Sequence, residues 1–154
     1  MSCWAASIRM IVAAHLASSS SINSDDDVAA PTNDQASLLS GLDPNSTTCL
    51  NYWGFSLTYP MSYTEDGFYQ LVLAHGPLWV ACDVRFPGAS RSCPHIRVVT
   101  AVASTGPLVL AINDPGPVGV GSIYNEAYTD FVAKNELLGT TELSQPSPIY
   151  IAYM

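Results

Sequence analysis

Residues 95–117, HIRVVTAVASTGPLVLAINDPGP, contain the pattern that decides the fold. Two β-rich runs, 96–103 and 108–112, flank a glycine–proline pair, which is typical of a tight turn between antiparallel strands. Positions 95 and 114 lie almost symmetrically about the centre of this turn, near residue 105. The predicted hairpin therefore places His95, at the beginning of one strand, beside Asp114 at the end of the other.

The segments around this hairpin predict helices in the first half of the chain and strands in the second. Trp4, Ile8 and Val12 recur at helical spacing, which predicts a helix that extends to Leu16. The other predicted helices cover 34–39, 64–74 and 127–138, further strands cover 78–84 and 149–153, and polar loops cover 18–27 and 43–45. This order predicts an α+β fold, with a helical lobe that faces an antiparallel sheet or half-barrel.

The composition and charge of the chain argue against a nucleic-acid-binding protein and against a membrane-spanning one. The chain has 154 residues, of which 48% are hydrophobic and 12% charged, and its net charge is −8. Such a chain can bury one sizeable core, so we expect a single domain over 1–154. Lys134 is the one lysine and the four arginines form no basic tract, which argues against nucleic-acid binding. The apolar runs are shorter than the ~18 residues of a membrane-spanning helix, and no signal-peptide pattern follows Met1.

Cys3 lies where the first predicted helix begins. The positive end of a helix dipole favours thiolate, the nucleophilic form of cysteine. On position alone, the alternative is a small buried residue, which is the commonest environment of an unpaired cysteine.

A cysteine nucleophile requires a base and a group that orients the base. His95 can fill the first role because a strand end can present an imidazole rigidly toward a cleft; the alternative is a solvated residue at a strand end. His15 lies on the same helix as Cys3, too far along it to reach the thiol. His75 ends a predicted helix and is expected to interact with its C-terminus. Asn113 and Asp114 are candidates to orient His95, although both also favour turns.

The remaining cysteines predict no metal site. Cys49, Cys82 and Cys93 make the total even, which permits disulfides, but the spacing is not that of a disulfide-dense scaffold. Cys82 and Cys93 with His95 fit no structural zinc pattern. An aromatic set in the middle of the chain is expected to fill the core between the lobes, with a few members lining a substrate groove: Tyr52, Trp53, Phe55, Tyr59, Tyr63 and Tyr69.

Four segments carry a resemblance to papain-like cysteine proteases: Cys3-Trp4-Ala5-Ala6, Gly76-Pro77-Leu78-Trp79-Val80, His95-Ile96-Arg97-Val98-Val99 and Ile112-Asn113-Asp114-Pro115. Among these proteases, the chain is most similar to compact bacterial effectors, such as avirulence-type proteases of plant pathogens and papain-like domains of polymorphic and type VI secretion toxins. The resemblance implies a papain-like fold with the cysteine on the helical lobe, and a reaction without metal or organic cofactor.

The resemblance also implies roles for individual residues. Cys3 would be the nucleophile, His95 the general base and acid, and Asp114 the orienting residue. Asn113 is the alternative for the last role, because papain uses an asparagine there. The backbone N–H of Cys3 would be one donor of the oxyanion hole.

Two features depart from the family pattern. Family members carry an oxyanion-hole glutamine a few residues before the cysteine, and only Met1 and Ser2 precede Cys3 here. Gln35 and Gln70 are conceivable replacements; the simpler expectation is a domain excised from a longer polypeptide. The spacing from Cys3 to His95 is also shorter than the ~130–150 residues of papain and cathepsins, which fits the compact bacterial group.

The implied function is a cysteine endopeptidase that cleaves target-cell proteins. It would be the toxic domain of a secreted bacterial effector, acting in the target-cell cytoplasm and opposed by a cognate immunity protein. The first alternative is another acyl-transfer enzyme with the same three residues, a deamidase, transglutaminase or peptidoglycan amidase. The second is a non-catalytic binding module with a vestigial cysteine. With its net charge of −8, the chain is not expected to attract substrates through a general basic field.

Overall fold

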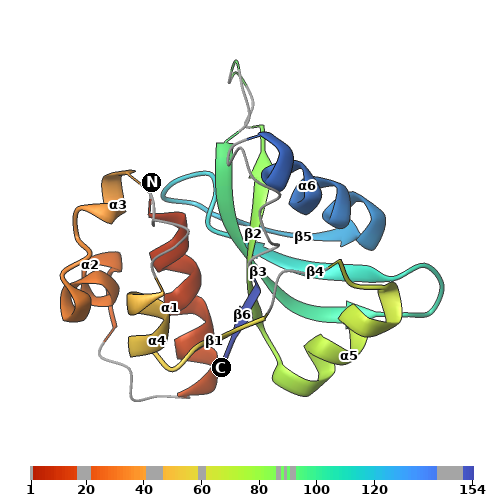
Figure 1. Cartoon of the computed structure of the whole chain (residues 1–154), viewed down its shortest axis with the longest axis horizontal. Helices are drawn as coiled ribbons and strands as arrows, with labels where there is room; N and C mark the ends of the chain where they lie inside the picture. Colours follow the sequence, from red (N-terminus) through yellow and green to blue (C-terminus); the bar gives the residue numbers. More distant parts are fainter. Residues whose placement is uncertain are drawn as a thin grey trace.

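A six-stranded antiparallel sheet forms the centre of the described structure (Figure 1). The computed structural model describes residues 2–16, 22–40, 47–58, 62–85, 88, 90, 93–141 and 151–154. In spatial order the strands are β1 (Ser56–Leu57), β6 (Ile151–Tyr153), β2 (Leu78–Val84), β3 (Cys93–Ala103), β4 (Val109–Asp114) and β5 (Ser122–Ala127). The helices are α1 (Cys3–His15), α2 (Asp25–Ala29), the 3-10 helix η1 (Ala30–Thr32), α3 (Ser37–Ser40), α4 (Thr48–Tyr52), α5 (Glu65–His75) and α6 (Tyr128–Thr141).

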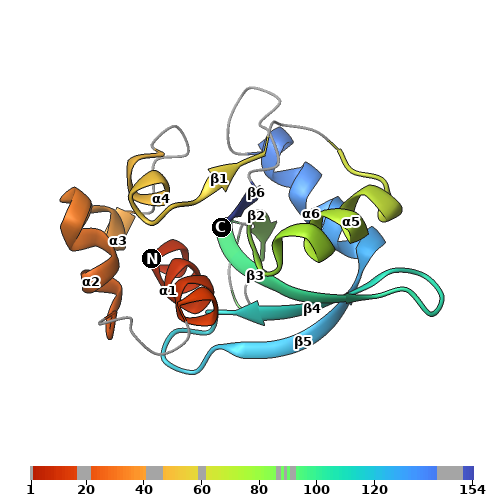
Figure 2. The ribbon, with the colours of Figure 1, turned by 90° about the horizontal axis from the view of Figure 1, so that it is seen from below.

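Side chains alternate across the strands and build a separate apolar core on each face of the sheet. On one face, Trp79 and Val98 pack against Trp4 and Ile8 of α1. On the other face, the neighbouring strand residues pack against aromatic side chains of α5 and α6, notably Phe68 and Phe131. Figure 2 shows α1 and the pair α5 and α6 on opposite sides of the curved strands. None of the described helices combines the length and the apolar character needed to cross a bilayer.

The hairpin prediction is confirmed. β3 and β4 pair antiparallel, from Ala103 opposite Val109 to Val98 opposite Asn113. The predicted strand at 78–84 is β2, and the predicted helices that begin at residues 4, 64 and 127 appear as α1, α5 and α6. The helix expected at 34–39 is displaced to α3, and of the strand expected at 149–153 the described residues are those of β6.

The prediction of an exposed loop over 18–27 is wrong at its end, where α2 begins. The Ser24 hydroxyl accepts a hydrogen bond from the Asp27 N–H, and the Asp27 carboxylate accepts one from the Ser24 N–H. This reciprocal pair is a capping box, which satisfies backbone donors that a helix start leaves unpaired. Residues 17–21 and the predicted loop at 43–45 lie outside the described residues.

The aromatic set does not form one core between two lobes. Phe55 and Trp53 pack into the core around α1, whereas Tyr63 and Tyr69 pack against the core around α5. Tyr52 is 58% exposed. Tyr59 lies outside the described residues. These aromatic residues therefore belong to different parts of the molecule, because α4 and α5 pack against opposite faces of the sheet.

The beginning of α1 is fixed to the sheet and to α3 by buried and partly buried hydrogen bonds. The Trp79 indole of β2 donates to the backbone carbonyl of Trp4 over 3.2 Å. The Trp4 indole in turn donates to the carbonyl of Ser37 over 3.1 Å. Ser7, which is fully buried, donates to the carbonyl of Ile96 in β3 over 3.5 Å. These contacts hold the residue before Trp4, which is Cys3, at a fixed place relative to β3.

We expect Gly76→Ala to lower the free energy of unfolding by about 1–3 kcal/mol, the usual cost of a side chain in such a backbone conformation. Gly76 ends α5 at φ +72, ψ −141, and an added Cβ would meet nothing nearer than His15 Nε2 at 4.0 Å. The loss should therefore come from the backbone. Chemical denaturation measures it, with Gly106→Ala as the control, since Gly106 lies in open space. Equal losses in the two variants would contradict this account.

Candidate active site

His95 and Asp114 form a short hydrogen bond at the open end of the β3–β4 hairpin. The distance from His95 Nε2 to Asp114 Oδ1 is 2.6 Å, and the two residues are only 4% and 8% exposed. Gly116 donates its N–H to the same carboxylate oxygen over 2.7 Å. The hairpin thus brings these two residues into direct contact, as the sequence predicts. With Val98 opposite Asn113 they are diagonal neighbours on one face of the hairpin and not a directly opposed pair.

Asn113, the alternative partner, lies on the other side of β4. Successive side chains leave a strand on opposite faces, so Asn113 and Asp114 point in opposite directions. Asn113 pairs with Val98, whose side chain belongs to the core around α1. The structure therefore brings Asp114, and not Asn113, to the imidazole.

Cys3 completes the cluster from the N-terminal end of α1. Its side chain is hydrogen-bonded to that of His95 and accepts hydrogen bonds from the backbone of Ile96 and of Trp4. Burial alone would raise the pKa of Cys3, but these hydrogen bonds and the charge of His95 outweigh burial and lower it. Ser2, at the N-cap position, makes no side-chain hydrogen bond to the first turn of α1, and Cys3 lies at the positive end of the helix dipole, which favours thiolate.

The same contacts hold a proton on His95. Burial alone would lower its pKa, but the hydrogen bonds to Asp114 and Cys3 and the charges of these two partners raise it to about 9. The pKa of Asp114 is lowered, because the donors His95, Gly116 and Tyr124 outweigh the effect of burial. Since Asp114 occupies Nε2, Nδ1 is the imidazole nitrogen left to face Cys3. The arrangement favours a thiolate, an imidazolium and a carboxylate in a row.

The environment of Cys3 differs from that of the buried cysteines. Burial raises the pKa of Cys82 to about 12, and it raises that of Cys49 as well. None of the four cysteines forms a disulfide. Within the described ranges, no three side chains of histidine, cysteine, aspartate or glutamate gather in a way that would hold a metal ion. Cys82, Cys93 and His95 are all described and form no such group.

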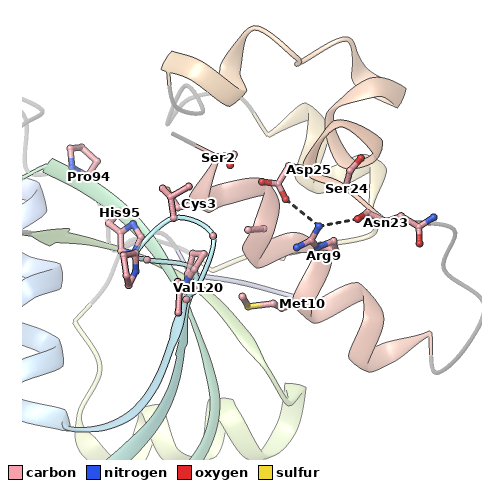
Figure 3. A pocket seen from close by; sticks show the side chains of 17 residues that line it. Ser2, Cys3, Arg9, Met10, Asn23, Ser24, Asp25, Pro94, His95 and Val120 are labelled. Atoms are coloured by element: carbon pink, nitrogen blue, oxygen red, sulfur yellow. Dashed lines mark hydrogen bonds and ion pairs between the residues drawn. The ribbon is translucent and has the colours of Figure 1, made fainter.

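A cavity of about 940 Å³ opens beside Cys3 and His95 (Figure 3). Its walls come from α1, from residues 23–25 and from the glycine- and proline-rich loop 115–121. Arg9 crosses one wall, where its Nη1 lies 3.6 Å from Asp25 Oδ1 and donates to the Asn23 carbonyl over 3.2 Å. Sequence reasoning missed these wall residues, because no motif or periodicity connects them to Cys3.

Gln35 and Gln70 do not take part in this site. Both side chains are exposed, and neither residue lines the cavity. The described structure thus places neither glutamine where it would replace the oxyanion-hole donor of the papain-like pattern.

The sequence model of one protein family, described as Papain-like cysteine protease AvrRpt2, matches residues 1–136 of the 154. The matched span includes Cys3, His95 and Asp114. No curated protein and no solved structure shows a significant match to the chain.

We expect Cys3 to react with iodoacetamide at mildly acidic pH, where an ordinary thiol of pKa near 8.5 is almost fully protonated. The reason is the lowered pKa of Cys3, which keeps thiolate present below the ordinary range. In His95→Ala the onset of the reaction should move to higher pH. Mass spectrometry of the Cys3 peptide across a pH series measures the shift, and coincident profiles for the two proteins would refute the pairing.

Proposed function

Since the chain belongs to the family of papain-like cysteine proteases related to AvrRpt2, it is a cysteine protease, and we propose that it is an endopeptidase that acts through Cys3, His95 and Asp114. The observation that carries this proposal is the continuous contact from the Cys3 thiol through the His95 imidazole to the Asp114 carboxylate. These three residue types in this order are the nucleophile, the base and the orienting group of cysteine and serine hydrolases.

The proposed reaction has two steps. The Cys3 thiolate attacks the carbonyl carbon of a peptide bond, the C–N bond breaks, and protonated His95 gives its proton to the leaving amine. The resulting thioester is then attacked by water, from which the now neutral His95 takes a proton. The second product leaves as a carboxylic acid, and the thiolate–imidazolium pair is restored.

Asp114 is assigned to hold the imidazole during both steps. Its bond to Nε2 fixes the ring so that Nδ1 faces the thiol, and its negative charge stabilises the imidazolium. The lowered pKa of Asp114 supports a carboxylate that stays ionised while His95 gains and loses its proton.

The backbone of Cys3 is assigned as one donor to the oxyanion. The first N–H groups of a helix have no partner within the helix, and Ser2 supplies no side-chain cap to α1. A negative oxygen that develops beside the Cys3 thiol would accept from this N–H group, as at other helix N-termini that bind anions.

The walls of the cavity support a two-lobed, papain-like arrangement. We assign α1 to α4 to the helical lobe that carries Cys3, and the sheet with α5 and α6 to the lobe that carries His95 and Asp114. The cavity takes its walls from both groups, since α1 and residues 23–25 belong to the first and loop 115–121 to the second. A substrate chain would lie between the two.

The biological setting proposed for this activity is a secreted bacterial effector. The likeness to the AvrRpt2 family supports it. The protease would act as a toxic domain on proteins in the target-cell cytoplasm, and a cognate immunity protein would block it by filling the cavity beside Cys3.

Cys3→Ala is expected to abolish the new protein N-termini that the wild type generates in a target-cell lysate, because no other group replaces the nucleophile. N-terminal proteomics measures this loss. Cys93→Ser is the matched control, a partly buried cysteine outside the cavity, and should leave the N-termini unchanged. Intact-mass analysis of a substrate adds a second criterion: hydrolysis gives two fragments, whereas a deamidase or transglutaminase leaves the chain whole. Cleavage by Cys3→Ala at the wild-type rate would rule out the mechanism.

Asp114→Asn should lower kcat/KM at least about tenfold, because a hydrogen bond to a charged group contributes roughly 1.5–3 kcal/mol. Asn113→Ala should leave kcat/KM within about twofold, since Asn113 lies on the opposite face of β4. Steady-state cleavage of a peptide that spans a site found by proteomics measures both values. The reverse order of effects would transfer the orienting role to Asn113.

A further inference from the structure

A line of hydrogen-bonded polar side chains begins at Asp114 and continues away from His95 across three strands. Its members are Arg97 on β3, Asp114 at the end of β4, and Tyr124 and Glu126 on β5. The register places Asp114 opposite Ser122, Ile112 opposite Tyr124 and Leu110 opposite Glu126. Alternate residues share a face, so all of these side chains lie on the side of the sheet that packs against α5 and α6.

The chemistry of the groups forces the direction of each hydrogen bond in this line. Arg97 Nη1 lies 2.9 Å from the Tyr124 hydroxyl, and that hydroxyl lies 3.1 Å from Asp114 Oδ2. A guanidinium can only donate, so the Tyr124 oxygen accepts from it. An ionised carboxylate can only accept, so the single proton of Tyr124 points to Asp114.

Tyr124 thereby binds the carboxylate oxygen that His95 does not use. Asp114 Oδ1 accepts from His95 and from the Gly116 N–H, and Oδ2 accepts from Tyr124. With donors on both oxygens, the carboxylate cannot rotate without breaking hydrogen bonds. We propose that Tyr124 is a positioning residue that holds Asp114 against His95, an inference that rests on the proposed role of Asp114. In this arrangement Arg97 fixes the Tyr124 hydroxyl in its donating orientation.

Arg97 is itself held in place. It is fully buried, and the same Nη1 also donates to Glu126 Oε2 over 2.8 Å. Its guanidinium carbon lies 5.7 Å from the centre of the Phe131 ring, a cation–π arrangement. Among the described residues, Nε and Nη2 of Arg97 have no hydrogen-bond partner. The pose of the guanidinium therefore depends on Tyr124 and Glu126, together with the neighbouring thiol of Cys82.

Arg97 and Tyr124 both keep their protons near neutral pH. Arginine remains charged throughout the working range of proteins. Burial raises the pKa of Tyr124 to about 12, so its hydroxyl keeps the proton that it donates to Asp114. Glu126 also accepts from Lys134 of α6, which ties the far end of the line to the helix above it.

Tyr124→Phe tests the proposal, because it removes the hydroxyl and keeps the ring. Loss of the donor should lower kcat about tenfold or more and leave KM unchanged, since Tyr124 does not line the substrate cavity. Tyr128→Phe is the matched control: its hydroxyl donates to the Tyr63 carbonyl over 2.6 Å and does not touch the line. An equal fall in kcat for the two variants, or a fall confined to melting temperature, would overturn the proposal.

A second measurement does not depend on cleavage. The solvent exchange of the His95 Nε2 proton, followed by NMR, should quicken about tenfold in Tyr124→Phe and stay at the wild-type rate in Tyr128→Phe. If the wild type cleaves no peptide, the proposed function fails, while this exchange still decides the role of Tyr124.

If Tyr124→Phe does not fold, Glu126→Gln takes its place, because it removes the charge that holds Arg97. Exchange should then quicken to a smaller degree, and unchanged exchange would overturn the proposal.

Discussion

The hydrogen bond between His95 and Asp114 is the interaction on which the rest of the site depends. Both side chains are almost fully buried, and a buried charge without a partner is strongly unfavourable. Each is tolerable here because the other is 2.6 Å away. Further contacts stabilise the same two charges: the Cys3 thiol is hydrogen-bonded to His95, and the Gly116 N–H and the Tyr124 hydroxyl donate to Asp114. The charges of the site therefore depend on one another: removing any one of these groups leaves a buried charged or polar group without its partner.

Rigid elements hold both halves of this set in register. Cys3 begins a helix whose first turn is hydrogen-bonded to β2 and packed against β3, and His95 and Asp114 extend from paired strands. Reactive groups on such elements need little reordering before reaction, which is the physical basis of preorganised catalysis. The contrast between Cys3 and Cys82 shows how the surroundings set the pKa of a thiol. Cys82 is buried without an imidazole partner, and burial raises its pKa to about 12.

Local pattern was sufficient to predict the hairpin, α1, α5 and the contact between His95 and Asp114, because each follows from periodicity or from symmetry about a turn. It was insufficient for Tyr124 and Arg97, whose contacts depend on β5 pairing with β4. The β5 segment mixes polar and apolar residues, and although a glycine- and proline-rich loop precedes it, no turn signal separates it from α6, which begins at the next residue. Arg9, Asn23 and Asp25 were missed for a similar reason. Asn23 and Asp25 reach the site because the beginning of α2 packs beside α1, next to Arg9. The capping box of α2 lies in a stretch too short and polar to predict a helix.

The most direct test of this account is a pH titration of the His95 ring nitrogens by ¹⁵N NMR, in the wild type and in Cys3→Ser. In the wild type the imidazolium should persist up to about pH 9, because the Cys3 thiolate and the Asp114 carboxylate both stabilise it. Replacing the thiolate by a neutral hydroxyl removes one of these charges, so the pKa of His95 should fall in Cys3→Ser. A neutral imidazole in the wild type at pH 7, or the same titration in both proteins, would contradict the ion pair at the centre of the proposed mechanism.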